Sequence, residues 1–199
     1  ASQTQEAKLQ SYKTNVELNV SDAAKDASAE NVSRLIGDTN AKTDAIMQPL
    51  GQDAKTIDKV KKDVAGEIVA SAVNALLQSG DYKTAKERLS EFRDQIPAAV
   101  ALKIKAEIEK VEFGEEMVKF WNEVKDLKLE NGAPDYEAME KQVKSKYSGT
   151  EFEKVWNFIQ GKAGEKERIE LNVRQDKDRS FSNEAITAQK NKVPFEEAI

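Results

Sequence analysis

Apolar residues recur every three or four positions between residues 57 and 77, and this spacing constrains the fold more than any other feature of the sequence. The stripe consists of Ile57, Val60, Val64, Ile68, Ala72 and Leu76, widened by Val69, Val73 and Leu77. Such spacing gives an α-helix one continuous apolar face. β-branched residues nowhere alternate with polar ones over the length of a strand, and the 199 residues include only four prolines and nine glycines. The sequence therefore predicts an all-α protein.

Similar patterns predict helices on both sides of this one. We expect them over approximately residues 29–48, 53–79, 82–95, 97–114, 115–129, 136–147, 151–163 and 164–192. The stripe expected in the fourth of them consists of Val100, Leu102, Ile104, Ile108 and Val111. Gly114 should end that helix, and Thr150 with Glu153 forms a capping box before the seventh. The predicted fold is an irregular, elongated array of about seven to nine helices, with a hairpin near the middle.

The distribution of apolar residues divides the chain into three regions. We expect a polar N-terminal helical arm over residues 1–51, a central helical domain over 52–162 and a charged C-terminal helical segment over 163–199 that continues in a longer parent chain. Apolar residues are sparse in both end regions, and a helix without tertiary contacts is marginal in water. The apolar residues in need of cover are Leu35, Ile36, Ile46, Phe181 and Ile186. We therefore predict that at least one end packs against a neighbouring copy of the chain.

No residue pattern in the chain indicates a reaction. Histidine and cysteine are absent, which removes the commonest general base, the commonest transition-metal ligand and all disulfides. Carboxylate pairs such as Glu115–Glu116 and Glu151–Glu153 are expected on exposed faces or helix caps, whereas a glycosidase needs its pair in a cleft. No run of 18 apolar residues indicates a membrane span. We expect no catalytic activity, no cofactor and no metal site.

Nucleic acid is disfavoured as a partner. The two short basic runs, residues 59–63 and 141–147, are flanked by acidic residues, and the formal net charge is -5. Trp121 and Trp156 lie on predicted apolar helix faces, so we expect them to pack in the core rather than to bind a ligand. Proteins are therefore the expected class of partner.

The stretch "ALLQSGDYKTAKERLSEFRDQIP", residues 75–97, predicts a helical hairpin. A glycine follows the first helix, where it can adopt the left-handed conformation, and an aspartate then caps the second. One face of the second helix is apolar, and a proline follows its end. The residues of this predicted hairpin are Gly80, Asp81, Tyr82, Ala85, Leu89, Phe92 and Pro97.

The spacing of these hairpin residues resembles the second half of a tetratricopeptide repeat. That resemblance implies an adaptor that binds a partner peptide in a helical groove. A repeat array needs about three stacked units, and the nearest second copy, "PDYEAMEKQVKSKY", follows 54 residues later with Met139 at the position of Ala85. We prefer a single hairpin, and the adaptor remains the alternative.

Three segments of the chain, taken in order, resemble a helical part of large tailed-bacteriophage virion proteins, which are tail-associated or internal. They are "VNALLQSGDYKTAKERLSEFRDQIPAAVALKIKAEIEK", "ENGAPDYEAMEKQVKSKY" and "AGEKERIELNVRQDKDRSFSNEAITAQ". The resemblance implies a structural or spacer role in a virion, through contacts with other virion or tail proteins or with further copies of the chain. It assigns no catalytic residue.

Overall fold

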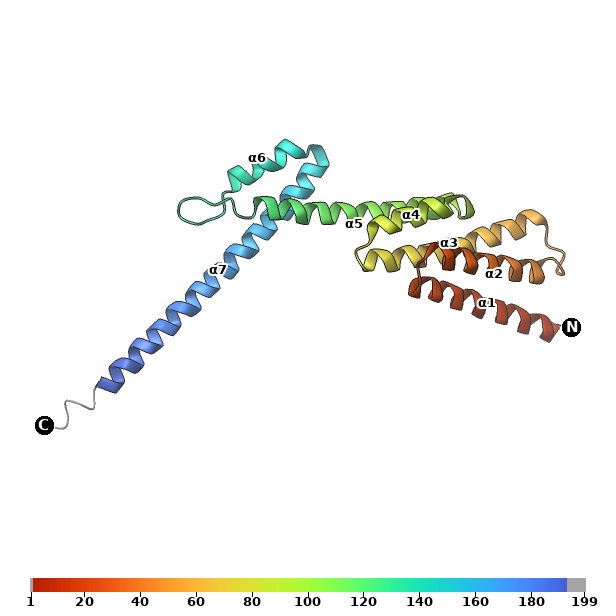
Figure 1. Cartoon of the computed structure of the whole chain (residues 1–199), viewed down its shortest axis with the longest axis horizontal. Helices are drawn as coiled ribbons and strands as arrows, with labels where there is room; N and C mark the ends of the chain where they lie inside the picture. Colours follow the sequence, from red (N-terminus) through yellow and green to blue (C-terminus); the bar gives the residue numbers. More distant parts are fainter. Residues whose placement is uncertain (1, 193–199) are drawn as a thin grey trace. The chain divides into compact units, whose positions relative to one another are not determined.

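The fold consists almost entirely of helices. The structure is a computed structural model that describes the backbone of residues 2–192 and the side chains of residues 5–182. Its elements are α1 (Ser2–Lys25), α2 (Ala29–Met47), α3 (Ala54–Gln78), α4 (Tyr82–Phe92), η1 (Arg93–Gln95, a 3₁₀-helix), α5 (Ala98–Val124), α6 (Tyr136–Lys146) and α7 (Gly149–Lys192), as shown in Figure 1. Over these residues there is no strand beyond one isolated bridge between Lys128 and Pro134. The all-α prediction is confirmed.

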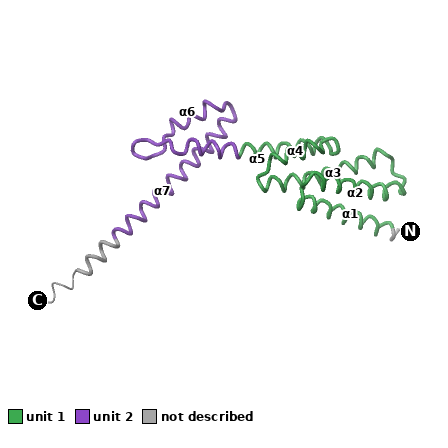
Figure 2. Tube along the Cα trace, viewed as in Figure 1, with its two compact units in different colours: residues 1–114 green, residues 115–199 purple. Residues whose placement is uncertain are grey.

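The chain forms two compact units, residues 1–114 (unit 1) and residues 115–199 (unit 2), which Figure 2 colours separately. This division differs from the boundaries predicted near residues 51 and 163. The N-terminal helices α1 and α2 pack against α3 within unit 1, and α7 contributes to unit 2 from its first turn. Packing partners rather than local polarity therefore define the units.

The core of unit 1 is built around α3. Most of its predicted stripe is buried, the remainder is half-buried, and the side chains of Ile68 and Val69 have no exposed surface. Leu35 and Ile36 of α2 are buried in the same cluster, although they come from the region predicted to be an arm. Apolar burial contributes roughly 25 cal/mol per Å² to the free energy of unfolding. Packing on α3 therefore stabilises helices whose own stripes are short.

Polar contacts complete the packing of α1, which is poor in apolar residues. The Asn19 side-chain amide donates to Thr39 Oγ1 at 2.8 Å, and the Tyr12 and Thr43 hydroxyls are hydrogen-bonded at 2.9 Å. Both threonines are buried, and each also donates to a backbone carbonyl four residues earlier in α2. Ser71 of α3 donates to the Val20 carbonyl at 2.7 Å. These bonds satisfy the buried hydroxyls, which would otherwise destabilise the interface.

Unit 2 packs α6 against the first half of α7. Its fully or nearly fully buried apolar side chains are Phe120, Val124, Met139, Val143, Tyr147, Val155, Ile159 and Ala163. The Lys166 ammonium group donates to the Lys125 carbonyl at 2.9 Å, which ties α7 to the end of α5. Among the helices that the structure describes, none is both long and apolar enough to cross a membrane.

Three predicted helix boundaries are wrong. α5 continues through Gly114, and α7 begins at Gly149, before Thr150, and continues through Gly164. Glycine inside a helix costs only about 1 kcal/mol relative to alanine. Helices that bury side chains on both sides of such a glycine recover more than this cost. Glycines and capping residues therefore predict more interruptions of the helices than the structure contains.

Candidate functional site

The predicted hairpin is formed by α3 and α4. Gly80 follows α3 with φ of 79°, a conformation that other residues adopt only with strain. The Gly80 amide donates to the Leu77 carbonyl at 3.1 Å and the Asp81 amide donates to the Leu76 carbonyl at 2.9 Å. This pattern is a Schellman motif. The Asp81 side chain then accepts from the Thr84 amide at 3.0 Å and caps α4.

The predicted apolar face of α4 is divided between two environments. Ala85 and Phe92 are buried in the core of unit 1, whereas Tyr82 and Leu89 are half-buried at its edge. Because the side chain of Ala85 is only a methyl group, α3 and α4 can approach each other closely. Leu89 packs against the edge of the same core and also lines the space between α4 and the helix that follows η1.

Pro97 begins that next helix where the chain touches α3 again. Its carbonyl accepts the first hydrogen bonds of α5, from the Val100 and Ala101 amides. A Cβ atom added at Gly66 of α3 would lie 3.2 Å from Pro97 Cδ and 3.4 Å from Val100 Cγ1. Gly66 thus permits the close approach of the start of α5 to α3. This role could not be predicted from the sequence, because a lone glycine within a helical stripe does not indicate what packs against it.

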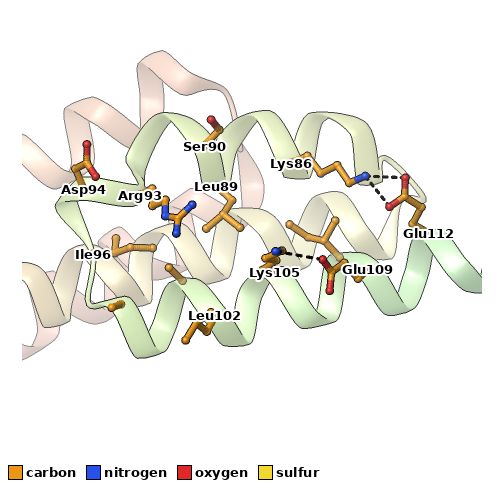
Figure 3. Close-up of a pocket in the computed structure, with 13 residues that line it drawn as sticks. Lys86, Leu89, Ser90, Arg93, Asp94, Ile96, Leu102, Lys105, Glu109 and Glu112 are labelled. Carbon is orange, nitrogen blue, oxygen red and sulfur yellow. Dashed lines mark hydrogen bonds and ion pairs between the residues drawn. The ribbon is translucent and has the colours of Figure 1, made fainter.

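A groove separates α4 from the first part of α5, with a volume of about 690 Å³; we refer to it as the α4–α5 groove (Figure 3). Its apolar walls include Leu89, Ile96 and Ile108. Leu102, which the sequence predicts to face inward, lies beside this groove with 64% of its surface exposed. The prediction for Leu102 is wrong because Ala101 and Ile104 turn toward the core, and a residue between them faces outward on a 3.6-residue helix.

Charged side chains line the rim of the groove. The Lys86 ammonium group of α4 contacts the Glu112 carboxylate of α5 at 2.6 Å and bridges the two helices. Lys105 and Glu109 form a second pair along α5 at 3.6 Å (Figure 3). Arg93 and Asp94 add one charge of each sign near the opposite end. The rim thus carries equal numbers of positive and negative side chains.

The groove combines apolar walls with a balanced charged rim, which is typical of surfaces that bind protein segments. Its rim residues were not predicted, because Lys86 and Glu112 are 26 residues apart and nothing in the sequence places them together. Within the described side chains, no three acidic residues come together as a metal-binding group. The groove thus offers apolar contacts on its walls and charges of both signs at its rim.

A second polar cluster lies in unit 2, at the junction between α6 and α7. The Tyr147 hydroxyl donates to Glu116 Oε1 at 2.9 Å, and its ring meets Phe120 edge-on with centroids 5.5 Å apart. The Lys146 ammonium group lies 5.3 Å from the Phe120 ring centroid, a cation–π contact. Burial, followed by the hydrogen bond to Glu116, raises the pKa of Tyr147. The phenol therefore stays protonated at neutral pH, and its hydrogen bond to Glu116 joins the end of α6 to α5.

The remaining sequence candidates are also placed by the structure. Trp121 and Trp156 are half-buried on helix faces of unit 2, and Glu151 and Glu153 are exposed near the start of α7. Asp135 caps α6 by accepting from the Ala138 amide at 3.0 Å. None of these residues lines the α4–α5 groove.

Comparison with known proteins identifies no relative of this chain. No protein family, curated protein or solved structure matches the chain. The observations that bear on function are therefore the sequence resemblance and the surfaces of the two units.

Proposed function

We propose that the chain is a non-catalytic structural module of a bacteriophage virion or tail-associated protein, and that it acts through helix–helix contacts. One observation carries the helix-contact part: α7 exposes four large apolar residues. They are Ile169, Leu171, Val173 and Phe181, with exposed fractions between 49% and 70%. Such residues on a helix leave apolar surface in water that contact with another helix would bury.

The virion part of the proposal rests on the three segments that resemble tailed-phage proteins. The structure is compatible with it, because the described residues form well-packed helices with mixed surface charge. Structural modules of this kind need no reactive group, and the sequence supplies neither histidine nor cysteine. Its partners would be other virion proteins or further copies of the chain.

Mass spectrometry of purified particles tests the virion role. Particles of the phage that encodes the chain should contain its peptides in a constant ratio to the major capsid protein after density banding. Recovery of the peptides only from the lysate, and never from the banded particles, would contradict the proposal. The purified chain should also leave a peptidoglycan suspension turbid, because no catalytic group is expected.

A peptide-binding adaptor is the second candidate, and the α4–α5 groove favours it. A helical groove with apolar walls can hold a partner helix by its apolar side chains. Selection of a peptide library on the immobilised chain should then enrich one motif, and Leu102→Asp should weaken its binding, because Leu102 lines the groove and is exposed. If no motif is enriched, the adaptor function is contradicted while the structural role is unaffected.

A further inference from the structure

One face of unit 1 carries both a projection and a hollow. Leu102 projects from α5 with 64% of its surface exposed, and the adjoining groove of about 690 Å³ is walled by Leu89 and Ile108. An interface between two identical chains related by a two-fold axis uses the same patch on both, so the patch must complement itself. A projecting leucine beside an apolar hollow meets this requirement, since each copy can insert its leucine into the other.

The charges of this face are also self-complementary. The rim has three cations and three anions: Lys86, Arg93, Lys105, Asp94, Glu109 and Glu112. The chain as a whole has a net charge of -5, so two copies meeting elsewhere on average repel each other, whereas at this face they do not. A charged peptide gains no net attraction from a rim of zero net charge. The rim thus favours an identical copy over a strongly charged peptide.

Lys105 and Glu109 define how the two copies would align. They lie one turn apart on the exposed side of α5. When two α5 helices approach antiparallel about an axis midway between these residues, Lys105 of each copy faces Glu109 of the other. Opposite charges then meet twice, once on each side of the axis.

We propose that the α4–α5 groove is an interface between two copies of this chain, with Leu102 of each copy inserted into the groove of the other. This inference rests on the proposed function in one respect, that helix contacts between copies are its mode of action. It adds the surface and the symmetry of the contact. The bound partner is a second copy, and a peptide in the groove is the competing outcome.

Sedimentation equilibrium of the intact chain over a wide range of concentrations tests the interface. We expect a monomer–dimer equilibrium, and Leu102→Asp should raise the dissociation constant by about tenfold or more. The matched control is Leu129→Asp, which replaces a half-exposed leucine outside both the groove and α7 and should leave the dimer unchanged. Circular dichroism should show unchanged helix content in both variants, because neither leucine is buried.

Charge reversal provides a test that does not depend on the leucine. Lys105→Glu and Glu109→Lys should each weaken the homodimer, because like charges then face each other across the axis. An equimolar mixture of the two single variants should restore association as a heterodimer, and the double variant should dimerise like the parent. A groove that binds an unrelated peptide has no reason to show this reciprocal rescue.

The outcomes separate this inference from the proposed function. A chain that stays monomeric at every concentration, or a dimer that Leu171→Asp disrupts and Leu102→Asp does not, overturns the groove interface. In the second case association through α7 stands, and with it the proposed structural role. Absence of the chain from purified particles would overturn the virion role without affecting a dimer measured in solution.

Discussion

The N-terminal helices and the second half of α7 have similarly polar sequences, but the apolar residues of α2 are buried and those of α7 are exposed. In α2, residues Val32, Leu35 and Ile36 lie on one face and are buried against α3. In α7, Leu171 is two residues from both Ile169 and Val173, and two residues correspond to about 200° of rotation. Leu171 therefore points away from Ile169 and Val173, which share a face, and all three are about half exposed. The phase of the apolar residues matters more than their number.

The comparison also bears on the expectation that one end of the chain packs on a neighbouring copy. The N-terminal end packs on α3 of its own chain, so it needs no neighbour. The α7 end remains the candidate, with Phe181 70% exposed. Ile186, which the sequence also predicts to need cover, lies outside the described side chains.

Hydrogen exchange should show the largest contrast between the two regions. Amides in the middle of α3 are expected to exchange roughly a thousandfold more slowly than those of residues 171–182, because they open only with the whole of unit 1. Mass spectrometry of peptides from the dilute chain measures both regions in one experiment. Equal protection in the two regions would show that something covers α7 even in dilute solution.

Core truncation should separate the two regions by several kcal/mol. Leu35→Ala should cost about 2–5 kcal/mol of unfolding free energy, because Leu35 is 1% exposed. The control Leu171→Ala, at a residue that is half exposed, should change it by less than about 0.5 kcal/mol. Urea unfolding followed by circular dichroism measures both variants.

Tryptophan fluorescence sharpens this experiment, because both tryptophans, Trp121 and Trp156, lie in unit 2. Leu35→Ala should shift the circular dichroism transition of unit 1 and leave the fluorescence transition in place. A fluorescence transition that moves equally would mean that the two units unfold together.

Substitutions in the hairpin should have intermediate effects. Ala85→Leu should cost about 1–3 kcal/mol, because it inserts a large side chain where α3 and α4 meet and no surface is exposed. Gly80→Val should cost at least about 1 kcal/mol, since φ at Gly80 is 79°. Gly161→Ala in α7 is the opposite control and should stabilise its helix, because a Cβ atom there meets nothing within 4 Å. Melting temperatures that match the parent for both hairpin variants would contradict the packing described for α4.

Acid should have the smallest effect, part of it through two helix caps of unit 1. Hydrogen bonds from the Thr56 and Thr84 amides hold the pKa values of Asp53 and Asp81 below their ordinary value of 3.8. A lowered pKa in the folded state stabilises it above pH 3.8, and this contribution is lost as the pH falls through the folded-state values. Unfolding by urea between about pH 5 and pH 2 should show the loss. Asp53→Asn and Asp81→Asn should reduce it, and an unchanged acid dependence in both variants would exclude the caps as its source.

Much of the fold could be predicted from local sequence. The stripe of α3 and the turn at Gly80 and Asp81 depend on residues close together in the chain, so spacing and capping chemistry identify them. The continuity of α5 through Gly114 could not be predicted, because it depends on side chains packed on both sides of the glycine. The candidate site was predicted in part: Leu89 and Ile108 were placed on apolar helix faces, but the charged residues that meet across the groove were not predicted.

By itself, the sequence determined that the chain is helical and where its hairpin turns, because helix periodicity and turn chemistry act over a few residues. Only the tertiary structure decided that α2 is buried, that Leu102 is exposed and that Lys86 meets Glu112 across a groove. The physical reason is that burial and ion pairing depend on how closely two helices approach. That distance is set by small residues such as Ala85 and Gly66, whose contacts lie on other helices.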